Sequence, residues 1–225
     1  MNIDPYNVLV FFHVLLFGYW LGSDWGVFCC DSQMIRHDLD IEERMRVRRI
    51  RYKIDIAPRT CLVLIMAIGF TMTPLRYGTP ISPVWLAAIW IASLAWLTLI
   101  IAGRVLTHTP RGEQLGRIDR KIWWIVGGAM MAVGAYALAT GDIALTKWLA
   151  LKMMLYGLIC WNGLWIMHSA DHWYPLIEMV RRGGDERIRA EPLMNKARFW
   201  CGTSAAVLWF LVLVVGFLGT VKPFP

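Results

Sequence analysis

Three ionisable side chains, His13, Asp24 and Lys152, lie inside long apolar stretches of the sequence. An ionisable group in membrane hydrocarbon is costly, so it usually faces the interior of a helix bundle and marks a functional site. At about 100° per residue, His13, Phe17, Trp20 and Asp24 fall on one stripe of a helix. This stripe is predicted to face the interior of the protein.

His13 and Lys152 are expected at similar depths below the same membrane surface. His13 lies about six residues (~9 Å) inside its apolar stretch, and Lys152 lies roughly nine residues inside another. A buried neutral histidine is a common ligand for haem b iron. Burial disfavours the charged form of lysine, so Lys152 could ligate iron or act as a base. The residue types alone also allow a hydrogen bond from His13 to a neighbouring helix and a Lys152 amine that reaches the membrane surface.

A second group of candidate ligands lies near the other ends of these stretches. It comprises His108, His168, Asp171 and His172. His168 and His172 are one helical turn apart and could share a metal ion or contact haem propionates. Together with His108 they form a candidate second metal site, although histidines are also common at membrane interfaces. Lys152 and His168 point to nearly opposite faces of a helix, which argues against a single cofactor bound by both.

Six apolar stretches are long enough to position these groups as membrane-spanning helices, which need roughly 20 residues each. The chain has 225 residues, 57% of them hydrophobic and 17% charged. The six stretches are Val8–Cys30, Ile56–Pro74, Val84–Leu106, Ile122–Thr140, Ile143–Met167 and Phe199–Val221. We therefore predict an all-α integral membrane protein, with residues 1–225 forming a single six-helix bundle.

The basic residues predict how this bundle is oriented. Three alternate loops hold 18 of the 23 lysines and arginines, whereas the turns near residues 77–83 and 141–142 are nearly uncharged. Because basic loops stay in the cytoplasm, both termini are predicted to lie outside. The same distribution explains the net charge of +7 without a nucleic acid partner. The segment Asp40–Ile54 is expected to extend the second spanning helix or to lie along the membrane surface.

Three further patterns narrow the possible chemistry and topology. The five cysteines form no CxxC or CxxCH motif, which disfavours covalently attached haem, a structural zinc site and a disulfide framework. The N-terminus lacks a basic region and a small-residue cleavage site, so the first apolar stretch is expected to be a retained helix. The methionines show no MxM or MxxM spacing that would favour a copper path.

Several motifs resemble the HemJ-type protoporphyrinogen IX oxidases. The first stretch reads His13-Val-Leu-Leu-Phe-Gly-Tyr-Trp20-Leu-Gly22, and the second begins after Arg48-Arg49-Ile-Arg-Tyr52-Lys-Ile-Asp-Ile-Ala-Pro58. Trp148-Leu-Ala-Leu-Lys152 is similar to that family's Trp-x-x-x-Lys helix, and the chain closes with Val221-Lys-Pro-Phe224. The related CopD-type membrane proteins share the general helical plan.

The resemblance implies a haem b cofactor with His13 as an iron ligand and Lys152 as the functional, catalytic lysine. Trp20, Tyr52 and Arg59 are expected to complete the cofactor site. The protein is then expected to be an oxidoreductase or electron-transfer protein of a bacterial inner membrane, similar to a porphyrinogen oxidase. A redox partner would bind on the cytoplasmic side, and the chain could form homo-oligomers. The alternatives are a CopD-like transporter of copper or another small solute, and a membrane anchor subunit of a redox complex.

Overall fold

The computed structural model describes residues 4–141 and 145–224, and the regular structure in these ranges is entirely helical. The helices are α1 (Pro5–Met34), α2 (Ile41–Ile54), α3 (Ile56–Tyr77), α4 (Pro83–Val105), α5 (Pro110–Thr140), α6 (Lys147–Arg182) and α7 (Gly184–Val221). Six helices are long and apolar enough to cross a membrane when α2 and α3 are taken as one continuous helix. The predicted all-α architecture with six spanning helices is confirmed.

Local sequence signals determine where these helices begin and end. Asp4 caps α1 by accepting a hydrogen bond from the Tyr6 amide at 3.0 Å, and Thr109 caps α5 by accepting one from the Gly112 amide at 3.1 Å. Both helices then have proline in their first turn. The helices α3 and α5 end at Gly78 and Gly141, with φ of 63° and 71°. Glycine tolerates this left-handed conformation because it has no Cβ.

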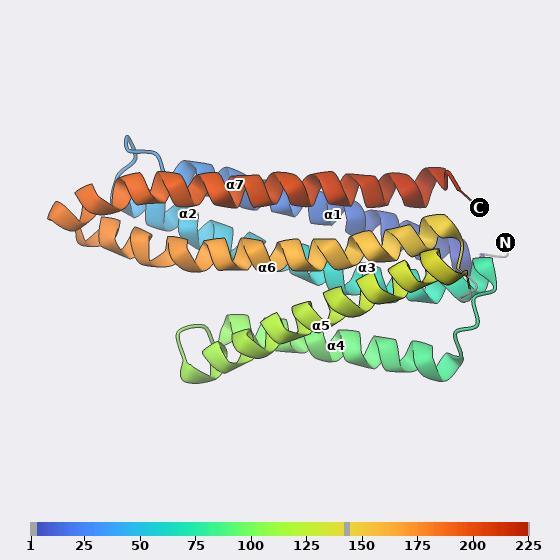
Figure 1. Cartoon of the computed structure of the whole chain (residues 1–225). Coiled ribbons are helices and arrows are strands. Elements are labelled where there is room, and N and C mark those ends of the chain that lie inside the picture. Colours follow the sequence, from blue (N-terminus) through green and yellow to red (C-terminus); the bar gives the residue numbers. More distant parts are fainter. Residues whose placement is uncertain (1–3, 142–144, 225) are drawn as a thin grey trace.

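The helices form a closed arrangement in which α1 packs on α3, α3 on α4, α4 on α5, α5 on α6, α6 on α7 and α7 on α1. A buried core fills its centre and includes Trp20, Leu62, Trp123, Ile159 and Leu208. Both termini lie at the same end of the bundle (Figure 1). We call this the terminal end. The opposite end, formed by residues 35–55, 104–121 and 168–198, is called the basic end.

The ends of several helices differ from the hydropathy-based prediction. The fifth spanning helix does not stop at Met167, because α6 continues to Arg182, and α7 begins at Gly184 rather than near Phe199. In Figure 1, α6 and α7 extend together beyond the loop that joins α4 to α5. The predicted loop between the last two spanning helices is therefore almost entirely helical. The predicted start at Ile143, and Asp142 in the preceding turn, lie outside the described residues.

Ion pairs hold the helices together at the basic end. The Arg44 side chain is only 1% exposed, and its guanidinium donates to the Glu191 carboxylate at 2.9 Å, joining α2 to α7. Arg48 binds Glu178 at 2.5 Å and joins α2 to α6. These contacts hold α2 as an extension of α3 against α6 and α7, which is the first of the two arrangements expected for Asp40–Ile54.

Candidate functional site

The His13 imidazole lies between α1 and α3 in the terminal half of the bundle. A Cβ atom added to Gly69 of α3 would lie 3.5 Å from His13 Cε1, so the ring packs directly against α3 at this glycine. His13 Nδ1 is buried and has no hydrogen-bond partner among the described residues. An unsatisfied buried polar atom costs about 1–3 kcal/mol. His13 therefore carries an unused hydrogen-bonding or ligating group.

The Lys152 side chain points from α6 into the bundle and reaches α7. A Cβ added to Gly219 would lie 2.7 Å from Lys152 Nζ, so the amine packs directly against the α7 backbone at this glycine. Lys152 is also close enough to His13 to interact with it electrostatically. Within the described part of the chain, Lys152 Nζ has no hydrogen bond or ion pair. The structure thus brings His13 and Lys152 together, two residues that are 139 positions apart in the sequence.

Aromatic and basic side chains cover this pair at the terminal end. The Lys222 amine lies 5.5 Å from the ring centroid of Tyr77 and 5.8 Å from that of Trp148. The two rings pack edge to face with centroids 5.4 Å apart. Lys222 also interacts electrostatically with Lys152. The surroundings of His13 and Lys152 are therefore positively charged and aromatic, which suits an aromatic ligand that carries carboxylates.

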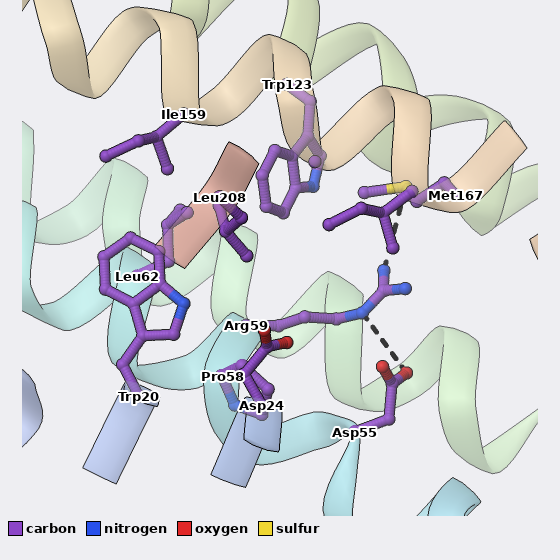
Figure 2. A pocket seen from close by; sticks show the side chains of 12 residues that line it. Trp20, Asp24, Asp55, Pro58, Arg59, Leu62, Trp123, Ile159, Met167 and Leu208 are labelled. Carbon is purple, nitrogen blue, oxygen red and sulfur yellow. Dashed lines mark hydrogen bonds and ion pairs between the residues drawn. The ribbon is translucent and has the colours of Figure 1, made fainter. Parts of the chain in front are cut away.

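Trp20 and Asp24 continue the stripe of α1 toward the basic end. Trp20 is buried in the central core. Asp24 accepts a hydrogen bond of 2.7 Å from the Trp209 indole of α7. Both side chains line a cavity that Arg59 enters from α3 (Figure 2). Asp24 is thus engaged by α7 and does not pair with Lys152.

Arg59 belongs to an ion-pair network between α3, α4 and α5. Its guanidinium lies 3.5 Å from the Asp55 carboxylate and 3.6 Å from that of Asp119, and Asp55 also pairs with Arg104 of α4. Asp119 Oδ1 accepts hydrogen bonds from two indoles, at 2.7 Å from Trp96 and 3.1 Å from Trp123, and these bonds fix the carboxylate. The network binds three helices at the level where the charged ends of the helices meet the core.

Tyr52 lies still nearer the basic end. Its hydroxyl donates to the Arg104 carbonyl at 3.0 Å, and the Arg104 guanidinium stacks over its ring at 4.3 Å. Arg59 itself precedes Gly69, the glycine that faces His13, by about 15 Å of helical rise. The five residues expected to share one cofactor site are therefore divided. His13 and Lys152 lie together, Trp20 and Arg59 line a separate cavity, and Tyr52 is beyond both.

The candidate second metal site is not assembled among the described residues. No group of three or more His, Cys, Asp or Glu side chains there could hold a metal ion, so His108 does not join the pair formed by His168 and His172. The two rings of that pair do pack together, with centroids 4.6 Å apart. His172 Nδ1 lies 2.9 Å from the His168 carbonyl, and both side chains are exposed within α6 rather than in a loop.

Sequence reasoning missed Asp119 and Tyr156. Asp119 lies outside the apolar stretch that begins at Ile122, because the polar first turns of α5 were expected to be a loop. Tyr156 is buried one turn after Lys152, and its hydroxyl donates to the Leu62 carbonyl of α3 at 2.9 Å. A period of four residues from Lys152 could have indicated that Tyr156 faces the interior.

No protein-family model matches the chain, and neither a curated protein nor a solved structure matches it. The function must therefore be argued from the residues of this chain.

Proposed function

We propose that this protein is a haem b-binding membrane oxidoreductase or electron-transfer protein and that His13 supplies an iron ligand. The observation that carries the proposal is the buried His13 Nδ1, which has no hydrogen-bond partner in residues 4–141 and 145–224 and interacts electrostatically with the Lys152 amine. Such a ring nitrogen inside an apolar bundle is suited to bind an added group. Histidine is also a common protein ligand for haem iron.

Two further features surround His13. Gly69 and Gly219 let the imidazole and the amine pack closely against α3 and α7, since a Cβ there would lie 3.5 Å from His13 Cε1 and 2.7 Å from Lys152 Nζ. Lys222 and Arg76 place positive charge at the terminal end, where Lys222 interacts electrostatically with Lys152 and Arg76 lies 5.9 Å from the ring centroid of Tyr6. These cations complement the propionates of a porphyrin. A bound haem would supply one-electron chemistry.

Lys152 has one of two roles beside such a cofactor. As a neutral amine it would be able to bind the iron of a haem held by His13, or it would take a proton from a substrate or donate one to it. Because Nζ packs against Gly219 and faces the interior, either role needs little movement of the side chain. A porphyrinogen-like donor would fit the aromatic and cationic surroundings.

The orientation in the membrane, the redox partner and the lipid contacts are part of the same proposal. The basic end would face the cytoplasm of a bacterial inner membrane, since arginine and lysine accumulate on that side. Exposed basic residues there, such as Arg111 and Lys121, would bind a redox partner. The many exposed apolar side chains of α1, α4 and α7 would contact lipid or another copy of the chain.

The pyridine haemochrome spectrum of the protein purified from haem-replete cells tests the proposal. We expect a b-type spectrum in the wild type and loss of most of it in His13→Ala. The matched control is His37→Ala, because the exposed His37 ring at the basic end only binds Glu191, with Nδ1 3.2 Å from Oε2. A colourless wild-type preparation would contradict the proposal and favour a transporter. Equal haem loss from both variants would contradict the role of His13.

A further inference from the structure

The cavity around Arg59 offers a site that the haem proposal does not use. Its volume is about 50 Å³, and it lies between α1, α3, α5, α6 and α7. Figure 2 shows the side chains of Asp24, Asp55 and Arg59 gathered on one side of this space, facing Leu208, Trp123 and Met167 on the other. A water molecule needs roughly 10–15 Å³ of such volume and two to four polar partners. The cavity therefore has the size and the polar groups to hold a few water molecules.

The ionic groups around the cavity are paired, with one exception. Asp55 and Asp119 pair with Arg59, and Asp55 also pairs with Arg104. Toward the basic end, Asp31 of α1 binds Arg51 of α2 at 2.5 Å. Asp24 has no ion pair among the described residues, and the Trp209 indole donates its one hydrogen bond.

No other helix forms an ion pair with Asp24 in the described part of the chain, although Arg51 of α2, which binds Asp31, also interacts with it electrostatically. On α7, Cys201 and Arg198 lie near Asp31, where Arg198 binds Ser32 at 2.6 Å. The residues that α6 contributes to the cavity are Ile159, Gly163, Ile166 and Met167, none of which titrates. Asp24 lies ten residues before the end of α1, or about 15 Å of helical rise, and so within the spanning part of the helix.

We propose that Asp24 is a proton-binding site inside the membrane and that it exchanges protons with the basic end through water in this cavity. A carboxylate in hydrocarbon without a counter-ion costs several kcal/mol, and binding a proton removes the charge. In the step itself, a hydronium ion in the cavity loses a proton, which forms an O–H bond with an Asp24 carboxylate oxygen. Nothing is oxidised or reduced, and the step needs no bound haem.

Arg59 contributes to this arrangement through the cavity that it lines. Because its charge is shared by Asp55 and Asp119, it keeps the cavity polar without neutralising Asp24. The opening toward solvent is provided by the same side chains, since those of Arg59 and Asp55 are 25% and 18% exposed. Protons would therefore reach Asp24 from the basic end, whereas His13 and Lys152 lie toward the other end.

Infrared difference spectra of the full-length protein in lipid nanodiscs, recorded between about pH 6 and about pH 9, test this proposal, because exposed carboxyl groups stay ionised over this range. We expect the C=O stretching band of a protonated carboxyl group to appear at the lower pH and to shift in D₂O. Asp24→Asn should remove the band, and Asp24→Glu should move it. The control Asp38→Asn should leave it unchanged, because Asp38 is fully exposed and its pKa is lowered by the hydrogen bond from Arg36.

Three results would overturn the proposal. The first is a band that persists in Asp24→Asn. The second is the absence of the band from the wild type at every pH. The third is a carboxylate signal that depends on sodium or ammonium concentration instead of pH, which would make the site a cation site. Asp24→Glu retains a carboxyl group, so it keeps the proposal falsifiable if Asp24→Asn fails to fold. None of these outcomes depends on haem content.

Discussion

At the scale of single residues, three ionisable side chains inside the bundle have no ion pair in the described part of the chain. His13 and Lys152 lie toward the terminal end, and Asp24 lies nearer the basic end. His13 and Lys152 could be located from the sequence because helical rise alone places them at similar depths. Their separation from Tyr52 and Arg59 could not be predicted, because it depends on where α3 passes α1. Resemblance assigned all of them to one site, whereas the structure divides them.

Replacement of Lys152 tests whether the amine serves a cofactor. We expect Lys152→Met to lose about ten- to 100-fold in haem affinity, since a lost ligand or charge-assisted hydrogen bond contributes about 1.5–3 kcal/mol. The bundle should be at least as stable in thermal unfolding, because methionine keeps the volume beside Gly219 without a desolvated amine. Haem titration followed by absorbance measures the first effect.

Two companion variants sharpen the Lys152 experiment. Lys152→Arg should also lose affinity, because a guanidinium stays charged and cannot ligate iron. Lys147→Met is the control, since Lys147 is exposed at the start of the same helix, and its affinity should not change. Normal haem binding by Lys152→Met would contradict any contribution of the amine or its charge to holding the cofactor.

Asp119 offers a stability prediction at the same scale. Asp119→Ala should lower the free energy of unfolding by about 2–4 kcal/mol, because the buried indole N–H groups of Trp96 and Trp123 both lose their acceptor. Asp119→Asn keeps one acceptor oxygen and should cost clearly less. Thermal unfolding followed by tryptophan fluorescence compares the two, and equal losses would show that the charge of Asp119, rather than its hydrogen bonds, is decisive.

At the scale of helices, the close packing of α5 on α6 depends on glycine. A Cβ at Gly134 of α5 would lie 2.5 Å from the Ala150 carbonyl oxygen and 2.8 Å from the Met154 amide nitrogen. A Cβ at Gly157 of α6 would lie 2.5 Å from the Gly127 carbonyl oxygen. Small residues let membrane helices approach in this way and gain van der Waals contact.

We therefore expect Gly134→Ala to destabilise the protein by about 1–3 kcal/mol, because backbone atoms of α6 cannot move aside as a flexible side chain would. The control lies in the same helix: a Cβ at Gly116 meets nothing within 4 Å. Gly116→Ala should be neutral or stabilising by up to about 1 kcal/mol, since alanine is the better helix former. Thermal unfolding in one detergent measures both variants, and a neutral Gly134→Ala would contradict the close contact.

Hydropathy predicts the membrane-spanning parts of the helices but not their full lengths. Six spans could be predicted because each contains a long apolar stretch, which the membrane requires. The continuations of α6 and α7 at the basic end could not, since Glu178, Arg187 and Glu191 end the apolar pattern although the backbone remains helical. These polar turns are stabilised by contacts between helices, such as Arg44 with Glu191, and such contacts have no local signal in the sequence.

At the scale of the whole molecule, the arrangement separates two environments along one axis. The terminal end holds His13, Lys152 and Lys222 beside aromatic rings, whereas the basic end holds paired charges that join α2 to α6 and α7. Electron transfer near one membrane surface and proton uptake from the other would be distinct events in such a molecule. The orientation of the bundle then decides from which side each event is supplied.

The last prediction concerns that orientation. The basic end carries 18 of the 23 lysines and arginines, and it lies opposite the termini. Positively charged segments are retained in the cytoplasm, so the terminal end should face the periplasm. Alkaline phosphatase fused after Phe224 should therefore be active, and green fluorescent protein fused there should be dark, because each folds on only one side of the membrane. The same reporters inserted after Gly183, between α6 and α7, should give the opposite result. The reverse pattern at both positions would place His13 and Lys152 near the cytoplasm and would require Asp24 to take its protons from the periplasm.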